Sequence, residues 1–62
     1  MLHEKELQSI KQNIQKAQPI VYNDQIVYAV YWNTLTFDNK IKIAFDHDKQ
    51  IIVDLIEFNN QN

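Results

Sequence analysis

The residues with the greatest chemical potential in this 62-residue chain are two histidines, one serine and eight carboxylates. His47 stands between Asp46 and Asp48, a group that could serve acid–base or metal chemistry. Adjacent residues of a turn point in different directions, however, and no second histidine lies nearby in the sequence. We therefore expect His47 to belong to a solvated turn. Ser9 lies in a helical pattern and lacks the elbow motif of a catalytic nucleophile.

The other candidates for chemistry are also weak. His3 precedes the apolar stripe of a predicted helix, where we expect it near the surface. Asp54 lies inside an apolar run, and burying an unpaired carboxylate is costly. We therefore expect Asp54 to be exposed or to accept backbone hydrogen bonds at a bend. We predict no enzymatic activity, no cofactor, no bound metal and no small-molecule substrate.

Residue types that are absent exclude several further classes of site. The chain has no cysteine, so it forms no disulfide and no thiolate metal site. It has no glycine, so it has no glycine-rich phosphate-binding loop. Its basic residues are six lysines without arginine, its net charge is −2, and it shows no basic stripe. These features make nucleic acid an improbable partner.

The chain is expected to be a cytoplasmic protein without membrane association. No segment approaches the ~18 consecutive apolar residues of a membrane-spanning helix. Residues 1–6 lack the basic region and apolar stretch of a secretory signal. Asparagine and glutamine together supply fourteen residues and isoleucine nine, a bias that indicates an AT-rich genome of a low-GC bacterium, phage or plasmid.

An amphipathic helix is predicted over residues 4–18. Its apolar residues recur at spacings of three and four, which places them on one face: Leu7, Ile10, Ile14 and Ala17. Pro19 lacks a backbone N–H and restricts the residue before it, so it ends the helix.

The remainder of the chain is predicted to form antiparallel strands. The β-branched and aromatic segments lie at 20–22, 25–37, 40–46 and 50–58, and residues 59–62 are expected to be loose. Turn residues separate the strands at 23–24, 38–39 and 46–49. The connections are too short for parallel crossovers. We predict one α+β domain over residues 1–62, with a helix on a three- or four-stranded antiparallel meander. A small barrel of the SH3 or Sm type is the alternative.

The segment 26–32 is apolar on both faces, and one helix cannot cover both. One set of residues can face the helix: Ile26, Tyr28, Val30 and Trp32. The other set then faces away: Val27, Ala29 and Tyr31. Barrel closure, stacking of two copies, or capture of a different protein could cover the second set. Tyrosine and tryptophan are enriched at interface hot spots, so the predicted protein-binding residues are Tyr22, Tyr28, Tyr31 and Trp32.

The order of these elements resembles the core of the YolD-like family of small bacterial and phage proteins. The likeness runs from Glu6 onward and comprises the helix, the segment 19–24, the strand 26–37, the turn and strand 38–43, and the closing run 51–58. The glycines of the family's turn and central strand are absent, as is its tryptophan-containing N-terminal segment. The resemblance implies a small barrel that partners a larger protein, in some cases a lesion-bypass polymerase.

The leading functional hypothesis is a protein-binding accessory or inhibitor module that acts through an aromatic sheet surface. The first alternative is a structural protein that assembles with itself as a homodimer or larger ring. The second is a small barrel that stacks nucleic-acid bases on its aromatic side chains.

Overall fold

The computed structural model describes residues 3–62 and begins with the helix α1 (Glu4–Lys16). The apolar stripe of α1 enters the core through Ile10 and Ile14, both of which are buried. Glu4 and Glu6 in the first turn and Lys16 in the last turn complement the helix dipole. The helix ends two residues earlier than the predicted boundary at residue 18, because Ala17 already has an extended backbone ahead of the restricted Gln18–Pro19 junction.

A small hairpin follows the helix, formed by β1 (Val21–Tyr22) and β2 (Gln25–Ile26). The predicted turn at residues 23–24 is confirmed. Asn23 and Asp24 have φ of 51° and 64°, and two consecutive residues with positive φ form the two-residue turn that suits a hairpin. Asparagine and aspartate tolerate this backbone region better than most residues do.

The single strand predicted over residues 25–37 is wrong. The segment is divided into β2, an irregular step at Val27 and Tyr28, the short strand β3 (Ala29–Tyr31) and the 3-10 helix η1 (Trp32–Thr34). The Thr34 hydroxyl donates to the carbonyl of Tyr31 at 2.6 Å and accepts from the N–H of Lys42 at 2.9 Å. These bonds replace the ladder bonds of a continued strand, so pairing stops at Tyr31.

The three-stranded sheet has the order β3–β4–β5, with β4 (Lys40–Asp46) between antiparallel neighbours. The strand predicted over residues 40–46 is confirmed. The hairpin of β4 and β5 (Lys49–Asp54) has an irregularity between Ala44 and Asp46, so Phe45 leaves the regular alternation. The two sheets remain separate, and the barrel alternative is therefore wrong.

The strand predicted over residues 50–58 is half wrong, because its second half forms the helix α2 (Leu55–Asn60). Asp54 is the N-cap of α2, and its Oδ1 accepts from the N–H of Ile56 at 2.9 Å and of Glu57 at 3.2 Å. A carboxylate at this position satisfies two N–H groups that have no partner inside the helix. The expectation that Asp54 accepts backbone hydrogen bonds at a bend is confirmed.

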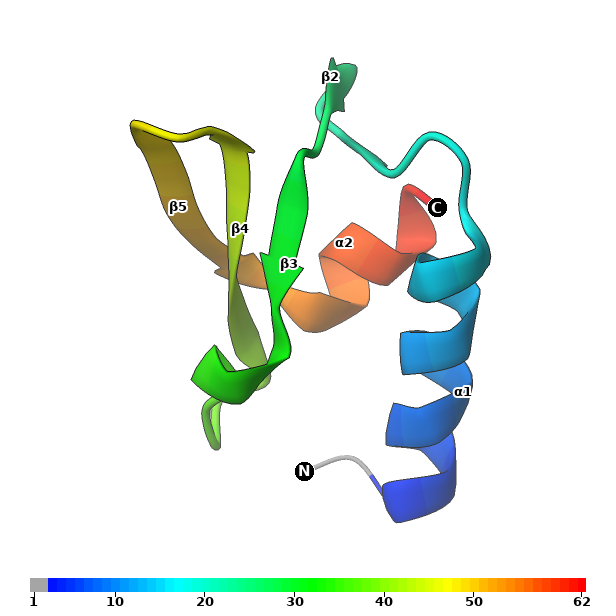
Figure 1. Cartoon of the computed structure of the whole chain (residues 1–62). Coiled ribbons are helices and arrows are strands. Elements are labelled where there is room, and N and C mark those ends of the chain that lie inside the picture. The colour runs from blue at the N-terminus through cyan, green and yellow to red at the C-terminus, as the bar shows by residue number, and fades with distance from the viewer. Residues whose placement is uncertain (1–2) are drawn as a thin grey trace.

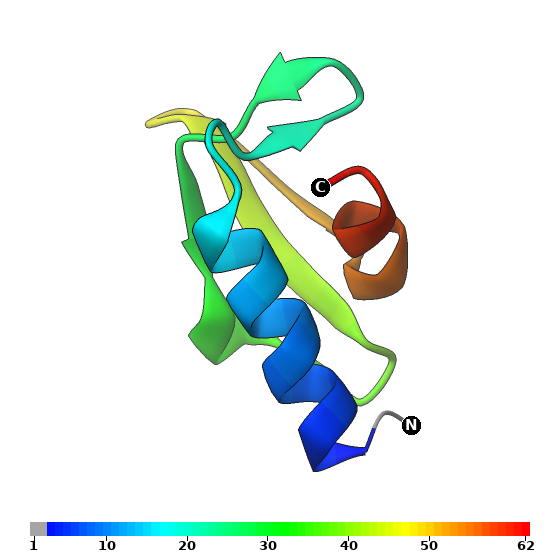
Figure 2. The ribbon, with the colours of Figure 1, turned by 90° about the vertical axis from the view of Figure 1, so that its right-hand side faces the viewer.

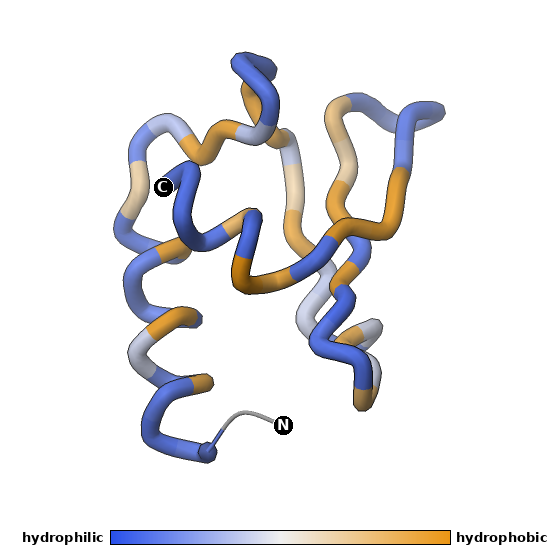
Figure 3. The backbone as a smooth tube through the Cα atoms, turned by 180° about the vertical axis from the view of Figure 1, so that it is seen from behind, coloured by the Kyte–Doolittle hydropathy of each residue, from blue (hydrophilic) through white to orange (hydrophobic). Residues whose placement is uncertain are grey.

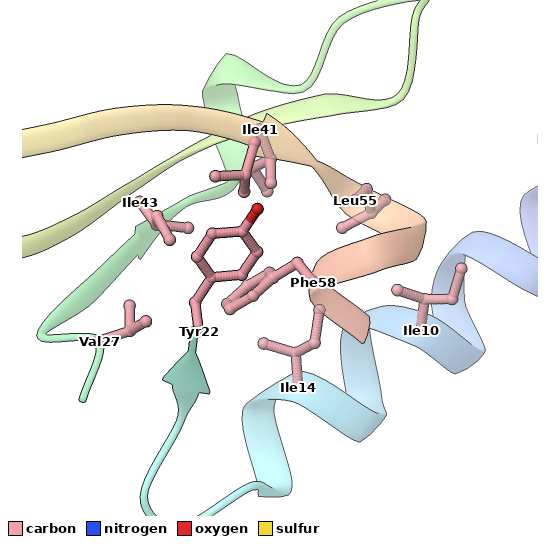
Figure 4. Close-up of a cluster of buried hydrophobic side chains, with 9 residues drawn as sticks. Ile10, Ile14, Tyr22, Val27, Ile41, Ile43, Leu55 and Phe58 are labelled. Carbon is pink, nitrogen blue, oxygen red and sulfur yellow. The ribbon is translucent and has the colours of Figure 1, made fainter. Parts of the chain in front are cut away.

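Both α-helices pack on one face of the three-stranded sheet, and the small hairpin closes one end of the core (Figures 1 and 2). Figure 4 shows the ring of Tyr22 meeting that of Phe58 between the sheet and α1, with ring centroids 5.9 Å apart. The buried core consists of Ile10, Ile14, Tyr22, Val27, Ile41, Ile43, Val53, Leu55 and Phe58.

The C-terminal residues are held in place, so the expectation of a loose tail is wrong. The Asn62 side chain accepts from the N–H of Val21 and donates to its carbonyl, both at 2.9 Å. The Asn13 amide on α1 donates to Asn59 at 2.8 Å. Amides near the end of the chain thus join α2 to both α1 and β1.

Candidate protein-binding surface

The helices leave the other face of the three-stranded sheet uncovered (Figure 1). Ile41, Ile43 and Val53 point into the core, so the side chains between them in the strands point away from it. We call this side the outer face, and its strand residues are Ala29, Tyr31, Lys40, Lys42, Ala44, Gln50, Ile52 and Asp54. Only alternation along regular strands decides which side chains belong to it.

Tyr31, Lys42 and Ile52 lie directly opposite one another across β3, β4 and β5, and we call them the central row. The Lys42 Nζ lies 5.6 Å from the centroid of the Tyr31 ring, within the range of a cation–π contact. Ile52 is 66% exposed, whereas Tyr31 and Lys42 are half-buried. The central row thus presents an aromatic ring, one positive charge and an exposed aliphatic side chain.

The neighbouring row of the outer face consists of Ala29, Ala44 and Gln50. Ala44 is fully buried but lies outside the core cluster. Ala29 and Ala44 have small side chains, so they add little height to the sheet beside Tyr31 and Lys42.

The four predicted binding residues do not form one surface. Only Tyr31 lies on the outer face. Trp32 lies on the other side, where it packs against the core. The Lys11 Nζ lies 5.4 Å from the centroid of the Trp32 ring. Tyr28 is 65% exposed, with its ring 5.4 Å from that of His47 at the β4–β5 turn.

Tyr22 is a core residue with 8% of its surface exposed, so it offers little surface to a partner. Tyr31 and Trp32 lie on opposite sides, as the alternation predicts, but the irregular step at Val27 and Tyr28 reverses the phase before Ala29. Val27 is buried in the core and Tyr28 is exposed, the reverse of the expected faces. Ile26, expected to face the helix, is 66% exposed.

Two members of the central row were missed by sequence reasoning, Lys42 and Ile52. The signal was present, since placing Ile41 and Ile43 inward leaves Lys42 outward, and the same alternation applies to Ile52 between two inward residues. The enrichment of tyrosine and tryptophan at interfaces favoured the four aromatic residues instead. Phe37, another aromatic residue, is 90% exposed on the turn before β4.

Burial raises the pKa of the Tyr22 phenol above its ordinary value of 10.0, and the carboxylates of Glu57 and Asp54 add to the effect. A raised pKa means that folding favours the neutral phenol. This contribution to stability is complete below the unfolded pKa and is lost as the pH rises through the folded pKa. We expect the free energy of unfolding to fall as the pH rises above about 10, the ordinary pKa of the phenol. The loss should be smaller in Tyr22→Phe, which cannot ionise there, and urea titrations of both proteins measure it. Equal losses would contradict this role of Tyr22.

The described residues contain little that could support chemistry. Within residues 3–62, no three histidine, aspartate or glutamate side chains gather as a metal site. His47 is exposed, and its backbone N–H donates to Oδ1 of Asp46 at 2.7 Å. His3 is exposed at the start of α1, and its side chain makes no capping bond. Neither α1 nor α2 has the length and apolarity needed to cross a bilayer.

The two lysine–aromatic contacts do not form a platform for nucleic-acid bases. Lys11 meets Trp32 on the side that α1 covers, whereas Lys42 meets Tyr31 on the outer face. Bases stacked along one strand of nucleic acid need rings on one continuous surface. The two contacts therefore provide no continuous surface for stacked bases.

Comparisons of the chain with protein-family models, with curated proteins and with solved structures found no match. The resemblance to the YolD-like family therefore stays a prediction.

Proposed function

We propose that this protein is a non-catalytic binding module that engages another protein through the outer face of its three-stranded sheet. The observation that supports the proposal is the central row of Tyr31, Lys42 and Ile52 on a face that neither helix covers. An accessory or inhibitory role in a phage, plasmid or low-GC bacterium belongs to the same proposal. It is supported by the small size and the residue bias of the chain.

The chemistry of the central row defines the partner surface that fits it. The Tyr31 ring and Ile52 offer apolar area at either end, and aromatic anchors supply much of the binding energy of protein interfaces. Lys42 lies between them and needs an acceptor when the surface is covered, since an unpaired charge is costly to bury. The complementary surface is apolar, with a carboxylate opposite Lys42.

The test is an affinity capture from a lysate of a low-GC bacterium, followed by titration of the purified partner. We expect Tyr31→Ala to weaken the partner's affinity by tenfold or more, because truncated hot-spot residues cost about 2 kcal/mol or more. Lys42→Glu should weaken it further, because the reversed charge would face the partner's carboxylate.

The matched control is Gln12→Ala, an exposed position on α1. It should capture the partner as well as the unchanged chain does. Circular dichroism of every variant confirms that the fold is intact. A partner that binds Tyr31→Ala and Lys42→Glu with unchanged affinity would place its site elsewhere and refute the proposal.

A further inference from the structure

The strand β5 forms an open edge of the three-stranded sheet. It is the last strand in the order β3–β4–β5, and no segment within residues 3–62 pairs with its free side. Figure 3 shows its apolar residues at the outer margin of the molecule. Ile51 and Ile52 are 41% and 66% exposed. Sheet edges are usually protected by proline, charge or bulges, and residues 50–53 contain neither proline nor charge.

One hydrogen bond determines which backbone groups of β5 face outward. The N–H of Leu55 donates to the carbonyl of Asn39 at 2.7 Å, next to the pair of Lys40 and Asp54. Bonded and non-bonded pairs alternate along an antiparallel ladder. Ile51 and Val53 therefore bond to β4, and the N–H and carbonyl groups of Gln50 and Ile52 point to the free side.

We propose that the free edge of β5 pairs with the same edge of a second copy of this chain, antiparallel and about a two-fold axis at Ile52. The inference is independent of whether another protein binds the outer face. An interface about a two-fold axis presents the same surface twice, so the strand must complement itself. β5 meets this condition in its register and in its charges.

The register follows from the outward groups. A residue whose backbone faces the edge can bond only with another such residue. Ile52 opposite the partner's Ile52 satisfies this condition, and Gln50 then lies opposite the partner's Asp54. On the core side, Ile51 lies opposite the partner's Val53. The pairing covers Ile51 and Ile52, the two exposed isoleucines of β5.

The charges of β5 favour the antiparallel direction. Lys49 begins the strand and Asp54 ends it. Antiparallel pairing brings the Lys49 end of each copy beside the Asp54 end of the other, whereas parallel pairing would bring like charges together. The β-bulge before Asp46 turns the hairpin away beyond this stretch, which limits the pairing to about five residues.

The short contact predicts a weak dimer. An edge of five residues buries less than the ~1,200–2,000 Å² of a standard interface, so we expect a dissociation constant in the range of about 10 µM to 1 mM. The dimer would have one six-stranded sheet. Its two central rows would join through the pair of Ile52 residues into a single stripe across the outer face.

Sedimentation or light scattering of the purified chain from about 10 µM to 2 mM measures the dissociation constant. Ile52→Lys and Ile52→Glu each place like charges directly opposite one another in the pair, which is destabilising. We expect each variant alone to weaken the dimer tenfold or more, and an equimolar mixture to restore it. Mixing can restore the dimer only if residue 52 of one chain lies opposite residue 52 of the other. The mixture therefore tests the register of the pairing as well as the contact.

Two further variants distinguish loss of the dimer from loss of the fold. A synthetic chain with N-methyl-isoleucine at position 52 retains the side chain and loses only the outward donor, so it should be monomeric and folded. Phe37→Lys adds the same charge at an exposed residue away from the edge, and should dimerise normally. A monomer at all concentrations would overturn the proposal. A dimer that Tyr31→Ala abolishes and N-methylation leaves intact would also overturn it, in favour of stacked outer faces.

Discussion

Phe58→Ala is expected to leave the chain largely unfolded at 25 °C. Phe58 has no exposed surface and lies at the centre of the core, where α2, β1 and α1 meet (Figure 4). Replacing a fully buried phenylalanine by alanine costs about 3–5 kcal/mol, because the surrounding side chains cannot close the cavity. A single core in a chain of this length rarely supplies more than ~3–5 kcal/mol of stability. Far-UV circular dichroism and urea titration measure the loss.

The matched control is Phe37→Ala, the same chemical change at a phenylalanine that is 90% exposed. It should change the free energy of unfolding by no more than ~0.5 kcal/mol, as exposed surface substitutions do. A cooperative Phe58→Ala protein with nearly unchanged stability would show that α2 does not complete the core in solution.

A chain that ends at Phe58 is expected to lose about 2–4 kcal/mol of stability, close to all that a domain of this length has. The deletion removes the bonds of Asn59 to Asn13 and of Asn62 to Val21 and Phe58. It also removes the bonds between Gln61 and Asn23. Each such bond contributes about 0.5–1.5 kcal/mol net, and the last turn of α2 is lost with them.

Asn60→Ala is the control for this deletion, because Asn60 is exposed and its side chain makes no hydrogen bond within residues 3–62. Its urea midpoint should match that of the unchanged chain. If the shortened chain unfolded at the same urea concentration as the full one, residues 59–62 would be the loose tail that the sequence predicts. The structure predicts a clear shift to lower urea.

The contrast between the two ends of the chain shows how far local patterns are informative. The helix α1 is recoverable from sequence because its apolar spacing, its terminal charges and Pro19 all act within a few residues of the chain. The run 51–58 is equally apolar, yet it contains a strand and a helix. The strand ends at Asp54, whose side-chain oxygen caps α2 by accepting from the N–H groups of Ile56 and Glu57. In the sequence this cap is a single acid within an apolar run.

The apolar residues on both faces of the segment 26–32 left barrel closure, stacking of two copies and capture of another protein as alternatives. In the structure the two sheets stay separate, and the helices leave one face of the three-stranded sheet uncovered. The residues on this face are determined by the irregular segment at Val27 and Tyr28 and by the end of strand pairing before Thr34. Both features depend on hydrogen bonds outside the regular strand ladders, such as those from Val27 to Ile20 and from Lys42 to Thr34.

The sequence by itself determined the α+β class, the N-terminal helix, the turns at Asn23–Asp24 and Asp38–Asn39, and the strand 40–46. Each depends on backbone preferences and on side-chain periodicity, which act between near neighbours along the chain. Only the tertiary structure decided that the sheet stays open, that Tyr22 is buried while Tyr31 is not, and that the last residues hold β1 and α1. Those outcomes depend on contacts between residues that are far apart in sequence. Local propensity carries no information about which distant segment will supply the partner.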